Sequence, residues 1–563
     1  MKYFYFFLLF CSIGCNSEKI EDKKALGNKK YGGVFTFLSA ERTTIFFPLS
    51  VTSVYDQRIL TQIFEPLFKI NNKGAIVNHL AKSYKEKLNG RVIRITIRKN
   101  VTFHSDACFS GSGKDLTAGD VKFSLDFACS GNKLNTMGDV FKDKIVGAED
   151  YYLKSNKKYD GKGVSGIKVL NDSTIQISLK DDFVNFKKLL AHPSIAIFSK
   201  KAYEFYQEDL VHHPIGTGPF QLRTYTNSKL VLERNPNYWK ADCFGNKLPF
   251  LREINVLYSK NINEEYNSFS KKRADIIFEL PIEILDNAFG TLSDAQNGKN
   301  LLHRVVLIKG AKINYLSFDC SSLPFNDYRV RKAFSMAIDR KKICLDVLNG
   351  EGNYAITGVI PKSSYYIPPE KTELKFDPIE ARRLMAEAGY NEISKFPQLT
   401  FFINTQKGSQ VDKWTKAIIH QLKQNLGVKL RIKYGTLSEK YKAIENNNTK
   451  IWKSSWVPDY PDAEAYLRIF YGNKSKKSNA SNHYNNFNNS LFDYNFKLSQ
   501  LSQNDERRLE LQRTCDEILL KEAAVAPIFS EDLFVIVNLR VRDFNINRSG
   551  IIDFSKIYIK EVY

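Results

Sequence analysis

The sequence predicts a mixed α/β protein made of several domains. The chain has 563 residues, and at about 100 to 200 residues per domain this length gives about three or four units. Stretches with the two-residue period of strands alternate with stretches that have the 3.6-residue period of amphipathic helices. The hydrophobic fraction of 43% supplies a buried core, which excludes a disordered or collagen-like chain.

The N-terminus predicts export. Lys2 precedes an apolar run at 3–10, which is too short for a bilayer span of about 20 residues. Gly14 directly before Cys15 fits a cleavage site, so we expect residues 1–14 to be a lipoprotein signal peptide. Residues 15–30 are polar and charged, as in a flexible tether. No later run is long enough to cross a membrane.

Cys15 is similar to the lipidated cysteine of a bacterial lipobox, although Ser12 stands where Leu is usual. The resemblance implies that acyl chains on Cys15 anchor the protein, and several chains hold a protein stably where one gives only marginal attachment. The alternative is an ordinary signal peptide with an incidental cysteine at this position.

Strand patterns recur along the chain. An apolar run after a glycine pair predicts a first strand at 31–38, and isoleucines alternate with polar residues at 91–99. A short polar turn between 167–170 and 174–179 predicts a hairpin. Strand character returns at 525–537 and 551–563, so we expect the chain to end in a sheet.

Helices are predicted from capping residues and apolar stripes. Thr117 and Asp120 have the spacing of a capping box, with Asp in place of the usual Glu. Asp327 can cap a second helix, in which an apolar stripe begins at Val330 and continues through Phe334. Further helices are expected at 380–388, 414–426 and 507–521, and exposed loops rich in Asn, Lys and Ser at 446–449 and 472–490.

The formal net charge of +22 suits anionic partners in general. The lysines are scattered, and Asn, Ile, Phe and Tyr are abundant too, which indicates a composition bias and a solvated basic surface. We therefore expect no nucleic-acid partner.

Catalytic and metal-binding motifs are missing. The sequence has no HExxH, GxSxG or GxGxxG, and in the glycine-rich segment at 111–115 Asp115 stands where a magnesium-binding Ser or Thr is required. His212 and His213 are adjacent, which is a poor spacing for two metal ligands on one face. We expect neither an enzyme nor a metal or other cofactor, although a site assembled from distant residues would escape a motif search.

Six cysteines follow Cys15, without a CxxC pair. Export permits disulfides, and Cys108 and Cys129 flank one short segment and could form a bridge, although sequence cannot prove the pairing. The other four are expected to be small buried hydrophobic residues.

Five short segments together carry a resemblance to a known family. In chain order they lie at 103–121, 213–220 (HPIGTGPF), 231–239 (VLERNPNYW), 330–340 (VRKAFSMAIDR) and 456–462 (WVPDYPD). Their order and spacing are similar to those of the family 5 extracellular solute-binding proteins, the oligopeptide- and dipeptide-binding components of ATP-binding cassette importers. The resemblance runs from about Gly32 to the C-terminus.

The resemblance implies a two-lobed periplasmic-binding-protein clamshell, type II-like and of cluster C, with an extra domain. Lobe I (domain I) would combine 31–70, 165–305 and 525–563, domain II would be 71–164, and lobe II (domain III) would be 306–524. The implied partners are a peptide ligand, the permease subunits and, through the lipid anchor, a membrane. The protein would be a monomer of the cell envelope that faces the periplasm.

Two of the segments have a structural interpretation. Gly216 and Gly218 permit positive φ values and Pro219 stiffens the exit, so this segment predicts a tight turn into a strand. The aromatic residues Tyr238 and Trp239 are expected to pack rather than to bind a ligand.

Asp459 is the leading candidate for ligand binding. Its neighbours Trp456 and Tyr460 are large and partly apolar, so a carboxylate there needs a cation or several donors. The resemblance implies that Asp459 forms a salt bridge with the amino terminus of a peptide. A local turn cap, in competition with Asp462, is the alternative.

The remaining site predictions come from the resemblance and from position. The backbone of Ser455, Trp456 and Val457 would bind an extended peptide by strand addition, which tolerates varied side chains. Glu41 on one lobe and Tyr315 on the other are expected contacts. Other solutes (a nickel chelate, haem or a sugar), a surface scaffold or adhesin, and an exported hydrolase remain alternatives.

Overall fold

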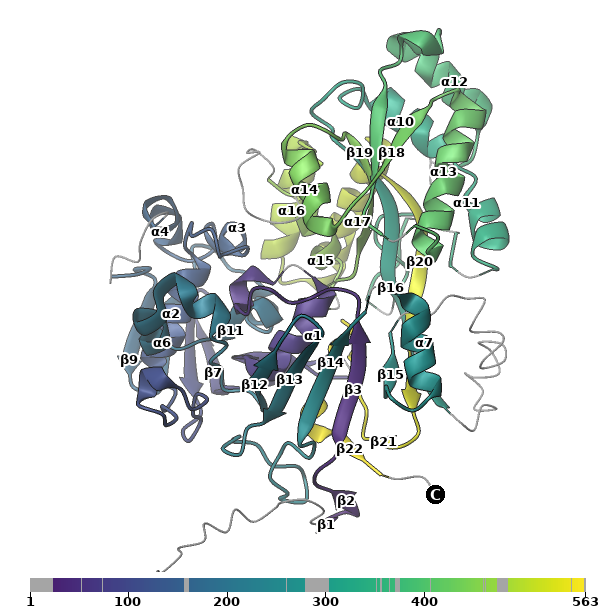
Figure 1. Ribbon diagram of the computed structural model, residues 1–563. Coiled ribbons are helices and arrows are strands. Elements are labelled where there is room, and N and C mark those ends of the chain that lie inside the picture. Colours follow the sequence, from purple (N-terminus) through teal and green to yellow (C-terminus); the bar gives the residue numbers. More distant parts are fainter. Residues whose placement is uncertain are drawn as a thin grey trace, which may run out of the picture.

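The computed structural model describes residues 24–560 except 52, 73, 156–161, 260, 279–302, 351, 355–356, 364, 370–374, 406, 459, 461, 473–484 and 548. The predictions for the signal peptide, for lipidation at Cys15 and for ligand binding by Asp459 lie outside the described residues. The described chain forms two lobes joined by long strands, with a further domain beside the lower lobe (Figure 1).

The central sheet of lobe I has the strand order β12-β13-β14-β3. Strand β3 (Val34–Ser39) runs parallel to β14 (Glu253–Tyr258), whereas β13 (Lys229–Arg234) and β12 (Phe220–Tyr225) continue the sheet in antiparallel register. Helix α1 (Val54–Ile63), capped by Ser53, lies against β12 (Figure 1). The first predicted strand is therefore confirmed.

The glycines of the predicted turn before β12 serve a close approach of two backbones. A Cβ on Gly216 would lie 1.9 Å from the carbonyl oxygen of Ile63, and one on Gly218 would lie 2.4 Å from that of Gln62. The positive φ values expected at these positions are not seen. The predicted turn into a strand is confirmed. Its glycines are required because a side chain would collide with the backbone at the end of α1, and not because of positive φ values.

The second domain contains the sheet β7-β8-β10-β9, whose strands are all antiparallel. Its strands are β7 (Ala81–Lys87), β8 (Val92–Ile97), β10 (Thr174–Ser178) and β9 (Ile167–Asn171). The predicted hairpin is confirmed as β9 and β10. Because β10 pairs with β8, the hairpin belongs to the sheet of domain II, and the boundary expected at 164/165 is wrong.

Helix α2 (Ala118–Ala128) covers this sheet, and its capping box of Thr117 and Asp120 is confirmed. Cys108 and Cys129 are free, so the bridge that the sequence left open is not formed. Cys108 lies in a turn before α2, whereas Cys129 caps the far end of this helix, which is about 16 Å long at 1.5 Å per residue. Burial raises the pKa of the Cys108 thiol to about 12 and also raises the pKa of the Cys129 thiol well above its usual range.

Lobe II is built on most of a six-stranded sheet, β15-β20-β16-β19-β17-β18, whose first strand, β15, lies at lobe I. Its strands are β15 (Ile276–Ile277), β16 (His303–Phe318), β17 (Leu399–Ile403), β18 (Leu430–Tyr434), β19 (Ile451–Trp456) and β20 (Val525–Asn538). Its helices include α10 (Tyr328–Met336), α12 (Pro378–Met385), α13 (Gln410–Leu426), α14 (Leu437–Glu445), α16 (Ser490–Leu501) and α17 (Asp505–Lys521). The helices predicted after Asp327 and at 380–388, 414–426 and 507–521 are confirmed as α10, α12, α13 and α17.

Strands β16 and β20 join the two lobes. Near lobe I, β20 pairs with β15, and the backbone N–H of Asn538 donates to Asp275. The register of β16 against β20 shifts between Ile308 and Lys312, and beyond this shift β16 also pairs with β19 in lobe II. The lobes are therefore connected by a two-stranded hinge (Figure 1).

The remaining elements are short. The helices are α3 (Gly138–Phe141), α4 (Ala148–Lys154), α5 (Phe186–Leu189), α6 (Lys200–Tyr206), α7 (Ile262–Ser270), α11 (Arg340–Lys342) and α15 (Glu464–Leu467). The strand pairs are β1 (Lys24–Ala25) with β2 (Lys29–Lys30), β4 (Glu65–Pro66) with β11 (Ala196–Ile197), β5 (Phe68–Ile70) with β6 (Ile76–Asn78), and β21 (Val541–Arg542) with β22 (Tyr558–Ile559).

Two terminal predictions need correction. The tether expected at 15–30 is ordered in its last part, because the Asn246 side chain bonds to both backbone groups of Leu26 between β1 and β2. At the other end, the strand expected at 551–563 is present, among the described residues 551–560, only as the two residues of β22. Asp553 caps a helical turn there, and this turn buries Phe554 in the core of lobe I.

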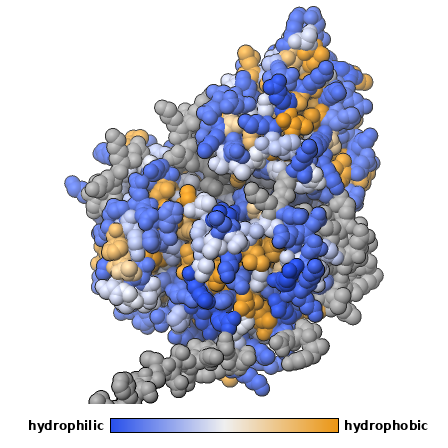
Figure 2. All heavy atoms as spheres, in the orientation of Figure 1, coloured by the Kyte–Doolittle hydropathy of each residue, from blue (hydrophilic) through white to orange (hydrophobic). Residues whose placement is uncertain are grey.

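The hydrophobic core explains why the lobes are separate bodies. One cluster of buried residues spans lobe I and the second domain, whereas two others fill the opposite faces of the lobe II sheet. The surface in Figure 2 is mostly hydrophilic, with hydrophobic residues in small groups, as expected for a solvated basic protein. Over the described residues, no helix combines the length and hydrophobicity needed to cross a membrane.

Arg331 of α10 holds the end of α17 in place. Although it is buried, its guanidinium donates to backbone carbonyls of Phe325 at 2.6 Å, Glu522 at 2.7 Å and Ala523 at 3.2 Å. Arg331→Leu should therefore lower the free energy of unfolding by about 3 kcal/mol, because it leaves these carbonyls without donors. Chemical denaturation monitored by fluorescence measures the loss. Exposed Lys341→Ala is the control, and an equal loss in both variants would contradict the role of Arg331.

Candidate functional site

The end of β19 carries the predicted peptide-binding backbone. Ser455 pairs with Asn314 and Trp456 with Ile313 of β16, and both side chains are half-buried. Val457 continues the chain beyond the strand. The segment therefore lies beside the hinge, on the lobe II side.

Glu41 and Tyr315, the predicted contacts on opposite lobes, both lie within electrostatic reach of Tyr441 on α14. Burial, with a contribution from the charge of Glu41, raises the pKa of Tyr441 to about 12. Burial also raises the pKa of Tyr315, and the neighbouring Tyr441 adds to this shift. Glu41 itself is exposed on lobe I. The structure thus brings the two residues to facing sides of the lobes, and ligand contact by either stays a prediction.

Two other predicted contacts have partners inside lobe II. Tyr460 is buried, and its hydroxyl donates to Glu464. The indole N–H of Trp456 donates to the carbonyl of Ala465 at 2.9 Å. The Tyr460 side chain therefore supports the segment from within. Asp462, the alternative turn cap, does accept from the backbone N–H of Glu464 at 2.9 Å.

Sequence reasoning missed two buried lysines beside this strand. Lys453 of β19 is 8% exposed, and its ammonium lies 5.9 Å from the ring centroid of Trp414. Lys440 of α14 is 4% exposed, with Nζ 3.5 Å from the backbone oxygen of Lys453. Burial, with repulsion from Lys453, lowers the pKa of Lys440 to about 7.

A third lysine and one carboxylate complete this cluster at the hinge. Lys312 Nζ lies 2.5 Å from Glu531, which also accepts from the side-chain amide of Asn314 at 3.1 Å. Although burial opposes ionisation, Lys312 and then Lys453 help to hold the pKa of Glu531 below its usual range. Lys312, Lys440, Lys453 and Glu531, which we call the lysine cluster, carry an excess of positive charge. An anionic group that bound here would meet two lysines, Lys440 and Lys453, that are already largely dehydrated, so the remaining cost of desolvation would fall mainly on the ligand.

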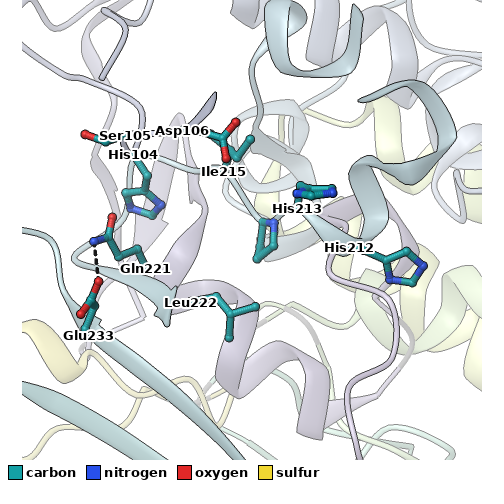
Figure 3. A pocket seen from close by; sticks show the side chains of 10 residues that line it. His104, Ser105, Asp106, His212, His213, Ile215, Gln221, Leu222 and Glu233 are labelled. Atoms are coloured by element: carbon teal, nitrogen blue, oxygen red, sulfur yellow. Dashed lines mark hydrogen bonds between the residues drawn. The ribbon is translucent and has the colours of Figure 1, made fainter. Parts of the chain in front are cut away.

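A separate polar groove of about 320 Å³ lies on lobe I, between a loop of the second domain and β12 (Figure 3). It is lined by His104, Ser105, Asp106, His212, His213, Pro214, Ile215, Gln221, Leu222 and Glu233. His213 stacks on Tyr206 with ring centroids 3.8 Å apart, and Asp106 accepts from the Tyr206 hydroxyl at 2.9 Å. Across the ranges that the structure describes, no three His, Cys, Asp or Glu side chains group as metal ligands.

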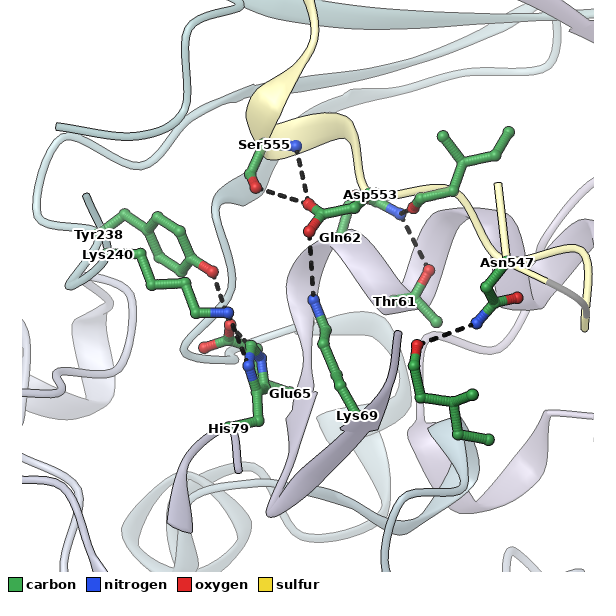
Figure 4. Close-up of polar contacts among 12 residues, drawn as sticks. Thr61, Gln62, Glu65, Lys69, His79, Tyr238, Lys240, Asn547, Asp553 and Ser555 are labelled. Carbon is green, nitrogen blue, oxygen red and sulfur yellow. Dashed lines mark hydrogen bonds and ion pairs between the residues drawn. The ribbon is translucent and has the colours of Figure 1, made fainter. Parts of the chain in front are cut away.

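The second and third family-like segments contribute to a buried polar network around Glu65 (Figure 4). Glu65 is fully buried and accepts from Tyr238 at 2.8 Å, Trp239 at 2.9 Å and Thr217 at 3.0 Å. His79 Nε2 lies 2.7 Å from Glu65, and Lys240 donates to His79 Nδ1 at 2.7 Å. The expected packing role of Tyr238 and Trp239 is thus confirmed, because the network fixes β4 of lobe I against the start of the second domain.

Several known proteins share this architecture. The family model described as bacterial extracellular solute-binding proteins, family 5, middle, matches residues 75–478. Glutathione-binding protein GsiB of Salmonella typhimurium is 25% identical over 496 residues, which are 87% of each chain.

Two solved structures share the fold. The periplasmic oligopeptide-binding protein OppAIV of Borrelia burgdorferi matches with a TM-score of 0.80 and 23% identity over 94% of this chain and 100% of that one. The periplasmic binding protein DppA of Helicobacter pylori, in complex with the peptide STSA, matches with a TM-score of 0.79 and 20% identity over 94% and 99%. The expected two-lobed α/β clamshell is therefore confirmed.

Proposed function

Because this chain belongs to family 5 of the bacterial extracellular solute-binding proteins, we propose that it captures short peptides for an ATP-binding cassette importer. The observation that carries the proposal is the end of β19, where strand backbone, Tyr315 and the lysine cluster lie together beside the hinge. An extended peptide can add to such backbone irrespective of its sequence. Closure of the lobes around it would present one defined state to the permease.

The lysine cluster supports an anionic ligand group. A peptide carboxylate, either terminal or on a side chain, would be attracted by the three lysines of the cluster. Glutathione, for which the GsiB relative is named, is a short peptide with two carboxylates and is a suitable probe. We infer that the preferred ligands carry a carboxylate near the segment bound by β19.

The cellular setting follows from the same proposal. Anchoring through acylated Cys15 would keep the receptor close to its permease at the cell envelope, and a monomer suffices for capture. The export pattern at the N-terminus is the support for this part. Growth with labelled palmitate, followed by purification, should label the wild-type protein and not Cys15→Ser.

Asp459→Ala provides the sharpest test of peptide capture. It should weaken peptides with a free amino terminus by about 3 to 5 kcal/mol, since a buried ammonium loses its counter-charge, and acetylated peptides far less. Isothermal titration with each matched peptide pair measures the difference. Equal losses for both would remove the role assigned to Asp459.

Ligand identity is tested on the protein itself. Native mass spectrometry of the soluble chain from Asn16, purified from a bacterial periplasm, should reveal heterogeneous peptide masses, and peptides of two to eight residues should raise the melting temperature. A protein that is purified without ligand and whose melting temperature does not change with peptides would contradict the proposal. A bound chelate, haem or sugar would show that the solute is of another class.

A further inference from the structure

We propose that Lys188 of lobe I and Asp462 of lobe II form a latch that holds the lobes closed. Lys188 Nζ lies 2.6 Å from Asp462 Oδ2, and the two side chains are 26% and 6% exposed. The inference rests on the proposed function only in assuming that the lobes open and close around a solute. It does not depend on which solute is bound.

Each partner belongs to the core of its own lobe. Lys188 lies on α5, whose Phe186 and Leu189 are buried in the lobe I cluster. Asp462 precedes α15, whose Tyr466 and Leu467 are buried in a lobe II cluster. The ion pair therefore connects two separately packed bodies, and relative motion of the lobes has to break it.

Lobe II positions Asp462 so that one carboxylate oxygen faces lobe I. Oδ1 accepts from the backbone N–H of Glu464 at 2.9 Å and from Gln512 of α17 at 3.2 Å. Oδ2 accepts from Lys188. The aspartate is thus held in place before the lobes meet, and Lys188 has to order only one side chain.

Further contacts between the lobes lie beside this pair. The backbone N–H of Val184 donates to the carbonyl of Gln500 at 3.3 Å, and Lys497 lies 3.8 Å from Asp181. The Gln500 side chain in turn donates to Glu464 at 3.1 Å. The segment that precedes Lys188 therefore runs along the end of α16, and the latch is more buried than the neighbouring pair of Lys497 and Asp181.

The charges on the two sides of the seam are complementary. Lobe II offers Asp462 and the buried Glu464, whose pKa is raised mainly by burial. Lobe I offers Lys188 and Lys144, and the charge of Lys144 acts on Glu464 in the opposite sense to burial, after the larger effect of Arg468 from lobe II itself. Like charges would oppose closure, whereas this arrangement favours it.

The latch shares a segment with the expected peptide strand. The chain leaves β19 at Trp456 and reaches Asp462 six residues later. A peptide bound along Ser455 and Trp456 would therefore contact the same short segment of chain that carries Asp462, the partner of Lys188. Ligand binding and closure would stabilise each other through it.

Small-angle X-ray scattering of the ligand-free soluble chain tests the latch, with Lys188→Met, Lys188→Arg and Lys187→Met compared with wild type. Lys187 is the matched control, because its ammonium lies over Phe68 and Tyr84, at 5.2 and 5.0 Å, on the lobe I side of the seam. We expect Lys188→Met to enlarge the radius of gyration, while the other two variants stay as wild type. Dissociation of a bound peptide should also become about tenfold faster in Lys188→Met.

Scattering, rather than thermal stability, separates a latch from a merely structural contact. A Lys188→Met protein with unchanged scattering would overturn the proposal, whether or not its melting temperature falls. Enlarged scattering in Lys187→Met would overturn it as well, because any lysine of α5 would then have the same effect. If Lys188→Met enlarges the radius of gyration but the wild-type protein binds no peptide, the latch is supported and the proposed peptide ligand is contradicted.

Discussion

Replacing Glu65 with leucine should lower the free energy of unfolding by about 3 to 5 kcal/mol, the cost of breaking a buried charged network by removing one member. The donors of Tyr238, Trp239 and Thr217 would lose their shared acceptor in a site without solvent. Urea denaturation monitored by tryptophan fluorescence measures the change.

Glu208→Ala is the matched control for this experiment. Glu208 also pairs with a lysine, Lys133 at 3.2 Å, but both side chains are more than 70% exposed. An exposed pair contributes about 0 to 1 kcal/mol, so this variant should unfold close to wild type. A loss in Glu65→Leu as small as in Glu208→Ala would show that the network does not stabilise the fold.

The same network should make the wild-type protein less stable in acid. Although burial opposes ionisation, His79 and the nearby lysines hold the pKa of Glu65 below its usual range, and burial lowers the pKa of His79 to about 3. Both Glu65 and His79 therefore have a higher pKa in the unfolded chain than in the folded protein, so the unfolded chain takes up their protons first as the pH falls. Stability should therefore fall as pH drops below about 6.5, the ordinary pKa of histidine, and Glu65→Leu should reduce the slope only below about 4.5, the ordinary pKa of glutamate, where Glu65 itself contributes.

Much of the fold could be predicted from local sequence. The capping box of Thr117 and the cap at Asp327 mark helix starts within a few residues, and the hairpin at 167–178 follows from its turn. For other residues, the contacts that explain their position come from distant parts of the chain. Arg331 is conspicuous in the sequence, but two of the carbonyls that hold it, those of Glu522 and Ala523, lie just after α17, 191 and 192 residues away.

The candidate site shows the same division. Resemblance indicates Ser455 and Trp456 because strand and motif are contiguous there. Lys440 and Lys453 are two among 83 lysines and arginines, and no neighbouring residue marks them. Their burial arises from Trp414 and from the pairing of β19 with β16, contacts that form only in the folded lobe.

Replacing Lys453 with methionine should weaken binding of carboxylate-bearing peptides by about 2 to 3 kcal/mol, or roughly 30- to 150-fold. The ligand carboxylate would enter a dehydrated site with one fewer counter-charge. Calorimetry with the tripeptide Ala-Glu-Ala, its glutamine analogue and its C-terminal amide measures the loss and shows which carboxylate the cluster holds.

The variant Lys440→Met allows a second test, the pH dependence of peptide affinity, which a packing defect would not change in the same way. Because burial lowers the pKa of Lys440 to about 7, its charge is present below this pH and lost above it. Wild-type affinity for the acidic peptide should therefore fall between pH 6 and pH 8, and Lys440→Met should lose this dependence. The ligand-free variant should melt no lower than wild type, since removing a buried charge relieves desolvation. An unchanged pH profile in Lys440→Met, or an affinity loss matched by a lower melting temperature, would contradict a binding role for the lysine cluster.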